Sequence, residues 1–491
     1  MFDVYLTDTV TSGNAISGDR SLYIAAGVTI ASTAGDGIST WGGDHEIDIE
    51  GHVFGGVIGV HVDSYPGTDD IYVGRSGSIL GGEYGLASLS HMLVVTNSGS
   101  ISGHLGVYAY RGDIRISNTG VISGTGTSGI TADFVTGRIA NTGTITGGIG
   151  GYGIHLNRGV NPDPTGHGAT PEIVNHGTIL GTPYGVYCAS DHDVTVRNYG
   201  TIDGVFLSGG DDHITNGGLI TGTLDLSGGD DVYLGVGDGR VERRIEGGAG
   251  DDTLTGGDKR DVIFGDAGKD TLTGGDGRDR LQGGAGDDLV LVEADGVADR
   301  LGGGDGQDTL DFSAIGDDLK IDLRSGTVRS VATGRDEIEW FEFVEAGGGN
   351  DVLIASDTTV RMRGRAGDDI LRGHDGADTL AGSAGDDLLV GNGGRDVLIG
   401  GWGDDTLAGK AGADLFIFAD GFGRDVIRDF NARSDREKID LQDVSAIRTF
   451  ADLATNHMRQ VGEDVRIAAA GEVIWLEGVD IADLQAVDFL F

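Results

Sequence analysis

The stretch from Gly247 to Leu291 reads GGAGDDTLTGGDKRDVIFGDAGKDTLTGGDGRDRLQGGAGDDLVL. Ten aspartates stand in these 45 residues against five lysines or arginines. A segment of this composition repels itself and has too few apolar side chains to fold unaided. We therefore expect the segment to fold only with a partner that supplies positive charge.

The stretch divides into five blocks of nine residues with two recurring positions. The sixth position is always Asp, and the eighth is always aliphatic: Asp252, Asp261, Asp270, Asp279 and Asp288, and Leu254, Ile263, Leu272, Leu281 and Val290. The glycine-rich half supplies turns that need positive φ, and the last three residues predict a short strand. Two blocks make one turn of a flattened coil, so carboxylates from blocks i and i+2 converge with turn carbonyls. An all-oxygen cage of this kind suits Ca²⁺.

The pattern G-G-x-G-x-D-x-U-x resembles the calcium-binding nonapeptide of the RTX (repeats-in-toxin) family, which forms a parallel β-roll. A second run of six blocks from Gly364 to Ile417 strengthens the resemblance, and looser copies surround Asp308 and Asp351. Lys259 replaces a turn glycine, and residues 355–363 lack the aspartate. The alternative interpretation, a flexible Gly/Asp linker, does not account for eleven blocks that match at both positions.

Calcium is thus the expected cofactor, in several copies. The predicted carboxylate ligands are Asp212, Asp231, Asp252, Asp261, Asp270, Asp279, Asp288, Asp308, Asp351, Asp369, Asp378, Asp387, Asp396, Asp405 and Asp414. The predicted carbonyl ligands lie in the turns that contain Gly248, Gly250, Gly268, Gly277, Gly286, Gly367, Gly376, Gly385, Gly394 and Gly403.

A different repeat of about 22 residues runs through the N-terminal part of the chain. Six units contain N-x-G-x-I or a close variant, with their asparagines at Asn97, Asn118, Asn141, Asn175, Asn198 and Asn216. Each unit contains three short strand patterns: one after the glycine, one with a Gly-aliphatic pair, and one before the asparagine. Three strands per unit predict one coil of a right-handed parallel β-helix, with the asparagines stacked as an internal ladder. A β-sandwich is the alternative, but it gives no reason for such a ladder.

The predicted fold is all-β, a parallel β-helix that continues into an RTX β-roll with a small C-terminal cap. The expected parts are the β-helix (1–204), transition coils (205–246), a first RTX block (247–311), an insertion (312–345), a second RTX block (346–417), and the cap with a type I secretion signal (418–491). Within the cap, residues 450–461 have a helical pattern. The secretion signal is implied by the resemblance to RTX proteins exported by type I systems.

The charge of the chain excludes several classes of partner. A formal net charge of −44 argues against nucleic acid and anionic membrane surfaces. No apolar run reaches the roughly 20 residues of a transmembrane helix, and the N-terminus lacks the pattern of a classical signal peptide. The single cysteine, Cys188, is interpreted as a small buried hydrophobe.

The sequence favours a secreted or cell-surface protein that folds on extracellular calcium and has a structural or adhesive role, with itself or an extracellular polysaccharide as partner. The alternative is a polyuronate lyase or epimerase, or a non-catalytic glycan-binding protein, carried on an RTX export module. No H-E-x-x-H, G-x-S-x-G or Walker motif is present, and no catalytic residue is assigned. Two polar groups remain open as sites: His155, Arg158, Asp163, His167 and His176, and His61, Asp63, Tyr65, Asp69 and Asp70.

Overall fold

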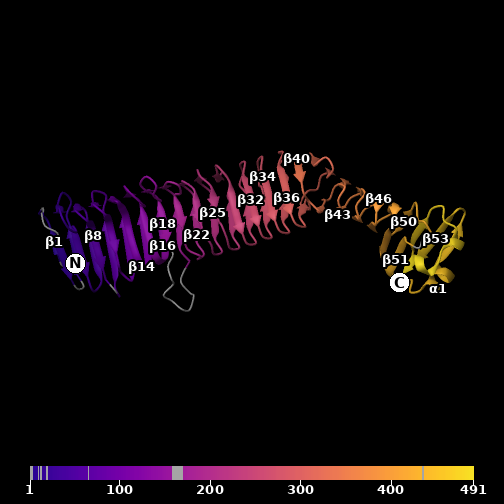
Figure 1. Cartoon of the computed structure of the whole chain (residues 1–491), viewed down its shortest axis with the longest axis horizontal. Helices are drawn as coiled ribbons and strands as arrows, with labels where there is room; N and C mark the ends of the chain where they lie inside the picture. The colour runs from indigo at the N-terminus through magenta and orange to yellow at the C-terminus, as the bar shows by residue number, and fades with distance from the viewer. Residues whose placement is uncertain are drawn as a thin grey trace. The chain divides into compact units, whose positions relative to one another are not determined.

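The computed structural model describes residues 4–8, 10, 14–17, 20–64, 66–157, 170–433 and 436–491. The chain divides into two compact units, one ending at Ala267 and the other beginning at Gly268. Each unit is a parallel β-solenoid made of short strands, as the sequence predicts, and helix is confined to a few residues near the C-terminus. Figure 1 shows the successive coils of each unit.

Three parallel sheets enclose the core of the N-terminal unit, and each complete coil up to Val241 contributes one strand to each sheet. Sheet 1 contains β2 (Asn14–Ser17), β5 (Ile38–Trp41), β8 (Ile58–Asp63), β11 (Tyr84–Ser88), the first half of β14 (Leu105–Asn118), the first half of β16 (Ile130–Asn141), β18 (Ile154–Asn157), β21 (Val186–Cys188), β24 (Val205–Leu207), β27 (Leu224–Asp225), β30 (Ile245–Ala249) and β32 (Val262–Ala267).

Sheet 2 contains β1 (Val4–Leu6), β3 (Arg20–Ile24), β6 (His45–Ile49), β9 (Thr68–Val73), β12 (Met92–Asn97), the second halves of β14 and β16, β19 (Glu172–Asn175), β22 (Thr195–Asn198), β25 (His213–Asn216), β28 (Val232–Gly235) and β31 (Thr253–Thr255). Sheet 3 contains β4 (Thr29–Ser32), β7 (His52–Gly55), β10 (Ser78–Gly81), β13 (Ser100–Gly103), β15 (Val121–Gly124), β17 (Thr144–Thr146), β20 (Thr178–Leu180), β23 (Thr201–Ile202), β26 (Leu219–Ile220) and β29 (Arg240–Val241).

Sheet 3 shows how an isoleucine in each repeat builds the core. Its strands pair in parallel with Ile79 opposite Val53 and Ile101, and Ile145 opposite Ile122 and Ile179. These side chains are fully buried, which stabilises each coil by roughly 1.5–3 kcal/mol per residue. Sheet 3 ends at Val241, so later coils have two sheets.

The predicted asparagine ladder is confirmed. The Nδ2 atom of each asparagine donates to Oδ1 of the next, at 2.8 Å in all five steps from Asn97 to Asn216. None of the six side chains is more than 1% exposed. The same amides also donate to backbone carbonyls of the adjacent coil, as Asn141 does to Thr178 at 3.2 Å. The ladder therefore satisfies the buried polar groups at one corner of the coil.

The substitution Asn141→Ala is expected to lower the free energy of unfolding by about 2–4 kcal/mol, because it leaves buried donors and acceptors of the neighbouring asparagines without partners. Urea denaturation in saturating calcium measures the change. Ser98→Ala is the matched control, since Ser98 accepts only an exposed bond from Thr119, and it should change the free energy by less than about 0.5 kcal/mol. Equal effects of the two substitutions would contradict a stabilising ladder.

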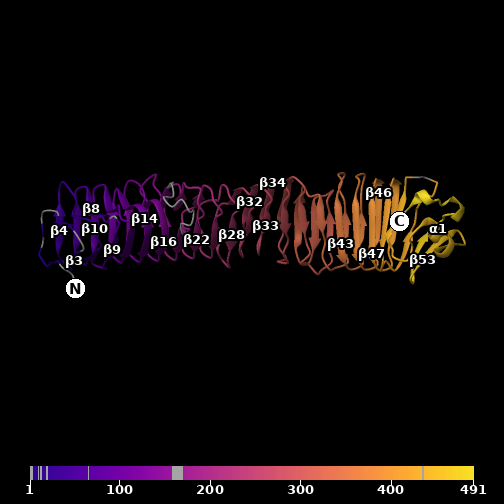
Figure 2. The same ribbon diagram turned by 90° about the horizontal axis from the view of Figure 1, so that it is seen from below.

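The C-terminal unit is built of two sheets, called sheet 4 and sheet 5. Figure 2 shows two strands of sheet 5, β43 and β47. Sheet 4 contains, in spatial order, β34 (Arg280–Ala285), β36 (Arg300–Asp305), β40 (Gly334–Glu339), β39 (Thr327–Ser330), β38 (Lys320–Asp322), β42 (Val352–Ile354), β44 (Ile370–Arg372), β46 (Leu388–Gly394), β48 (Thr406–Gly412), β50 (Arg424–Ile427), β54 (Glu472–Leu476), β53 (Asp464–Ala469) and β52 (Met458–Val461).

Sheet 5 is parallel throughout and contains β33 (Thr271–Thr273), β35 (Leu289–Leu291), β37 (Thr309–Asp311), β41 (Phe343–Glu345), β43 (Arg361–Ala366), β45 (Thr379–Ala384), β47 (Val397–Trp402), β49 (Leu415–Ala419), β51 (Lys438–Asp443) and β55 (Phe489–Leu490). The eighth-position side chains predicted to point inward are buried in both RTX blocks, as Leu281 and Leu389 illustrate.

The segment predicted as an insertion, residues 312–345, forms strands β38 to β41 within the solenoid. Strand β39 is antiparallel to both β38 and β40, and all three lie in sheet 4 between β36 and β42. Sheet 5 has only β41 between β37 and β43. Sheet 4 therefore holds two more strands than sheet 5 at this level. The domain boundaries proposed from the sequence remain predictions.

The C-terminal cap begins with the last coils, contains the antiparallel strands β52, β53 and β54, and ends with β55 paired in parallel with β51. Its helical part consists of α1 (Phe450–Asp452), a π-helical turn (Leu453–His457) and two 3₁₀ turns (Ile481–Asp483 and Ala486–Asp488). The predicted helix over 450–461 extends too far, because β52 pairs antiparallel with β53. Gly462, at φ +67°, permits the two-residue turn between these strands.

Candidate metal centre

All fifteen aspartates predicted as ligands lie inside the coils, and none is more than 2% exposed. Each one immediately precedes a strand or begins the short segment that leads into it; Asp387, for example, stands directly before β46. The turn places the carboxylate inside the coil, and the side chain two residues after the aspartate points into the core. The nonamer spacing thus repeats the same inward carboxylate at every turn.

One oxygen of these carboxylates is held by the backbone of the neighbouring coil. Asp387 Oδ1 accepts from the N–H of Asp369 at 2.8 Å, and Asp405 Oδ1 accepts from the N–H of Asp387 at 2.9 Å. The same bond recurs at Asp231, Asp252, Asp288, Asp308, Asp369, Asp396, Asp414 and Asp425. The carboxylates therefore form a ladder that runs from coil to coil.

The second oxygen of many of these carboxylates is buried without a hydrogen-bond partner. This holds for Oδ2 of Asp212, Asp231, Asp288, Asp308, Asp336, Asp369, Asp387, Asp396, Asp405, Asp414 and Asp425. In the second RTX block this oxygen lies against the first glycine of its block: a Cβ on Gly382 would overlap Asp387 Oδ2, and one on Gly400 would overlap Asp405 Oδ2. Unpaired buried oxygens in a glycine-lined space are what a bound cation requires.

Burial raises the pKa of the eleven carboxyl groups with an unpaired Oδ2, and the neighbouring carboxylates add to the effect. The pKa of Asp387 rises to about 8, as do those of Asp212 and Asp425, and that of Asp369 rises to about 7. Desolvation of the charged form is the largest cause in each case. A divalent cation within the coil would restore the ionised form, because an opposite charge favours it.

The glycine turns stack backbone carbonyl oxygens from one coil to the next. Nine of the ten glycines predicted in the ligand turns have positive φ, from +112° at Gly248 to +141° at Gly268, whereas Gly376 does not. A Cβ on Gly385 would overlap the carbonyl oxygen of Gly367 one coil earlier. Side chains at these positions would therefore collide with the stacked turn carbonyls, which explains why the turns are built of glycine.

Carboxylate and carbonyl oxygens together determine which metal fits. Within the described residues, no three His, Cys, Asp or Glu side chains gather at one point. An ion here would be held by one or two carboxylates and by turn carbonyls. Ca²⁺ accepts such a set of hard oxygens in flexible geometry, whereas Zn²⁺ prefers nitrogen and sulfur.

Three carboxylates of the same kind were missed in the sequence. Asp299, Asp336 and Asp425 accept the backbone bond of the ladder from Asp279, Asp299 and Asp405, and burial raises the pKa of each. Two of the three, Asp336 and Asp425, keep the Gly-x-Asp-x-aliphatic pattern, in GRDEI (334–338) and GRDVI (423–427). The insertion and the cap break the nine-residue spacing before these copies, so the spacing alone did not reveal them.

Among the described residues, neither polar group left open as a site brings three His or Asp side chains together. Asp69 is buried with His45, whose Nδ1 lies 2.7 Å from Oδ1, whereas His61 pairs with Asp36 at 3.2 Å. His155 lies on sheet 1, and His176 stacks on Tyr199 in the turn that follows Asn175. Tyr65, Arg158, Asp163 and His167 lie outside the described residues. Cys188 is buried, which raises the pKa of its thiol and disfavours a thiolate nucleophile.

The fold and these ladders define a class of protein, a parallel β-solenoid whose coils carry internal carboxylates for calcium. The family described as the RTX calcium-binding nonapeptide repeat matches the chain at residues 246–281, 264–296, 273–310, 345–380, 361–389 and 382–416. Residues 246–310 and 345–416 are therefore RTX repeats, and these repeats bind calcium.

One of the solved structures that the chain resembles is the extracellular lipase LipA from Serratia marcescens, at 19% identity and a TM-score of 0.21. The match covers 54% of this chain and 45% of the lipase chain. No curated protein matches. Among the described residues, no helix has the length and apolar character needed to span a bilayer.

Proposed function

We propose that the protein is secreted, folds when its RTX repeats meet extracellular calcium, and serves a structural or adhesive role at the cell surface or in the extracellular matrix. The observation that carries the proposal is the ladder of buried carboxylate oxygens without partners, which leaves the coils unstable until calcium arrives. The fifteen aspartates predicted as ligands, together with Asp299, Asp336 and Asp425, supply the carboxylates, and the glycine turns supply the carbonyls.

The same property supports export before folding. Calcium in the cytosol is too scarce to fill sites of the 10⁻⁴–10⁻³ M affinity typical of extracellular modules, so the chain stays extended inside the cell. RTX repeats accompany substrates of type I secretion machinery, which we propose as the export partner. Outside the cell, the free energy of calcium binding becomes free energy of folding.

A solenoid of stacked coils suits a structural role because its ends and edges can pair with further copies. We expect calcium added to the metal-free protein to produce β-sheet circular dichroism and, in parallel, light scattering from ordered particles larger than a monomer. Electron microscopy at the endpoint distinguishes filaments or sheets from amorphous aggregate. A β-signal that develops while the protein stays monomeric would exclude self-assembly, and a polyuronate cleavage assay would then test the alternative enzyme function.

A further inference from the structure

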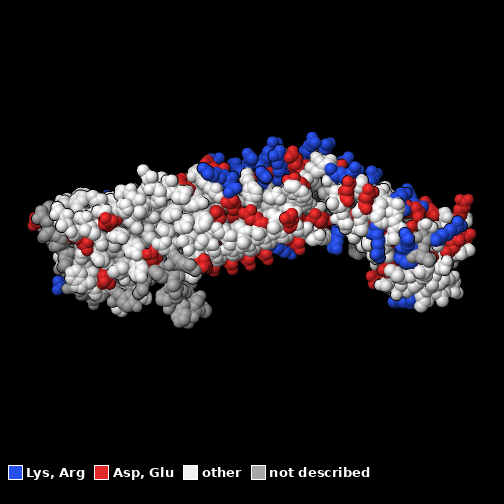
Figure 3. Space-filling model, viewed as in Figure 1, with Lys and Arg blue, Asp and Glu red and all other residues white. Residues whose placement is uncertain are grey.

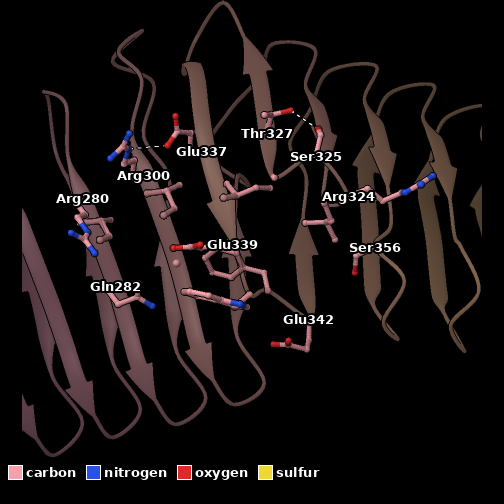
Figure 4. A pocket seen from close by; sticks show the side chains of 18 of the residues that line it. Arg280, Gln282, Arg300, Arg324, Ser325, Thr327, Glu337, Glu339, Glu342 and Ser356 are labelled. Atoms are coloured by element: carbon pink, nitrogen blue, oxygen red, sulfur yellow. Dashed lines mark hydrogen bonds and ion pairs between the residues drawn. The ribbon is translucent and has the colours of Figure 1, made fainter.

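The two strands that sheet 4 gains over sheet 5 open a hollow on the surface of the C-terminal unit. Because neighbouring strands are spaced by about 4.8 Å, the added strands lengthen sheet 4 on one side only. The hollow has a volume of about 1130 Å³ and lies over β34, β36 and β40, beside the turn between β38 and β39. Figure 4 shows that its labelled side chains come from all of these elements.

A row of cations crosses the added strands and reaches the hollow at Arg335. Lys320 of β38 stands directly opposite Arg329 of β39, which stands directly opposite Arg335 of β40. All three are exposed, and Arg335 lines the hollow. Like charges at opposite positions of a sheet are destabilising. Within the described part of the chain, none of the three forms an ion pair, so the row has unused capacity for an anion.

A second cationic pair lies within the hollow itself. Arg280 and Arg300 are opposite each other on β34 and β36, and Arg300 forms an exposed ion pair with Glu337 at 2.8 Å. Figure 3 shows Lys and Arg side chains gathered over β34 to β40, although the chain as a whole has a net charge of −44. This surface is therefore a local exception to an acidic protein, and it attracts negatively charged ligands.

The other lining groups indicate that the ligand also carries hydroxyl groups. Glu339 and Glu342 line the hollow together with the uncharged Gln282, Ser325 and Thr327. Glu342 accepts a backbone bond from Asp308 at 3.0 Å, which fixes its position. Carboxylate oxygens of this kind accept bonds from ligand hydroxyls, whereas they repel a ligand that presents only anions.

Trp340 adds an aromatic surface to the hollow. It follows β40, is 59% exposed and has φ +58°, a left-handed conformation that is unusual for a bulky residue. Phe341, the next residue, is buried in the core. The strained backbone thus separates two neighbouring aromatic rings, one packed inside and one held in the open. Strain of this kind is characteristic of binding sites, and an exposed indole offers a flat face for a sugar ring.

We propose that this hollow binds an acidic polysaccharide made of uronic acid units. The guanidinium groups of the arginines bind the planar carboxylates of the uronic acids in bidentate fashion. Glu339 and Glu342 accept hydrogen bonds from the sugar hydroxyls, and the indole of Trp340 packs against a sugar ring. A nucleic acid fits less well, because its backbone presents phosphates to the same two glutamates without a comparable set of hydroxyl donors. The proposal extends the adhesive role by naming a ligand, and it does not depend on self-assembly.

The test measures binding of the full, calcium-loaded protein to oligogalacturonate by isothermal titration calorimetry. A length-matched cello-oligosaccharide and duplex DNA serve as the neutral and the phosphate-bearing comparisons. We expect oligogalacturonate to bind and the other two to bind at least tenfold more weakly, roughly the loss expected when one charge-assisted contact is absent. Short oligomers are used because calcium crosslinks long uronate chains.

Two variants locate the site. The triple variant Lys320→Gln, Arg329→Gln and Arg335→Gln, and the single variant Trp340→Ala, are each expected to weaken oligogalacturonate binding by about tenfold. Their matched control is the triple variant Arg395→Gln, Arg428→Gln and Arg459→Gln, which removes the same charge from exposed positions away from the hollow; its affinity should stay within about twofold. Circular dichroism in calcium verifies that all variants fold.

The proposal is overturned if the wild-type protein fails to bind oligogalacturonate, if both triple variants lose affinity equally, or if DNA binds and oligogalacturonate does not. Each of these results leaves the calcium-dependent assembly untouched, because assembly is measured without any glycan. Conversely, a monomeric protein that still binds oligogalacturonate would refute self-assembly and retain the glycan site.

Discussion

Chelation of calcium is expected to unfold the RTX coils of residues 364–417 while the coils around the asparagine ladder stay folded. Asp369, Asp387, Asp396, Asp405 and Asp414 would each hold a buried oxygen with no partner. An uncompensated buried charge costs about 3–5 kcal/mol, so a few of them exceed the roughly 5–15 kcal/mol that stabilises a whole domain. The asparagine ladder between Asn97 and Asn198 is neutral and fully hydrogen-bonded.

Hydrogen exchange followed by mass spectrometry separates the two regions. In excess chelator, peptides from 364–417 should exchange at the rate of an unfolded chain, whereas peptides from 97–141 should keep their protection. The control is the same chelator saturated with calcium, which should leave both regions protected. Magnesium should restore little protection, because it demands a regular octahedral geometry and gives up its water reluctantly. Protection of both regions in chelator would show that the carboxylate ladder is stable without metal.

Acidification of the metal-free protein is expected to restore β-structure. The folded pKa values are raised, to about 8 for Asp387 and Asp425 and about 7 for Asp369, above the unfolded value of about 3.9. Protonation therefore favours the folded state: its contribution is fully present below about pH 4 and is lost as the pH rises through about 7 to 8. In chelator, the β-signal should grow as the pH falls from about 9 to about 5.

Circular dichroism and light scattering recorded together follow this transition. Scattering marks the onset of precipitation near the isoelectric point of about 4.3, so the titration stops above it. Asp387→Asn carries a neutral side chain at a buried position, and it should raise metal-free stability at high pH while weakening calcium binding. Glu463→Gln removes a charge from an exposed turn outside the RTX repeats and should change neither. A β-signal in chelator that falls or stays constant on acidification would contradict the raised pKa values.

The repeats carry most of the information about the fold and the site. A nine-residue period with Asp at the sixth position and an aliphatic residue at the eighth places one carboxylate and one core side chain in every half-coil, as Asp387 and Leu389 show. The Asn-x-Gly period predicts the ladder for the same reason, because each coil repeats the geometry of the one before it. In such repeats, the contacts between neighbouring coils join residues that are one repeat apart, and the length of the repeat can be read directly from the sequence.

The nine-residue period did not predict the ligand aspartates where the repeat is interrupted. Asp336 and Asp425 keep the local Gly-x-Asp-x-aliphatic pattern but follow segments of irregular length. They lie in the carboxylate ladder because the chain forms a further coil of the solenoid after each of these segments. The helix predicted over 450–461 is cut short for a related reason. Strand β52 pairs with β53 across the turn at Gly462, and this pairing outweighs the local helical preference.

The residue spacing alone specifies the coils, the asparagine ladder and the calcium chemistry, because each depends on contacts between equivalent residues one repeat apart. The positions of β38, β39 and β40 follow only from the folded chain, since these strands reverse direction and enter sheet 4 in an order that no period encodes. That placement aligns Lys320, Arg329 and Arg335 and opens the hollow beside Trp340. Residues brought together by a change of strand order share no repeat spacing, so their contact appears only when the sheet is assembled.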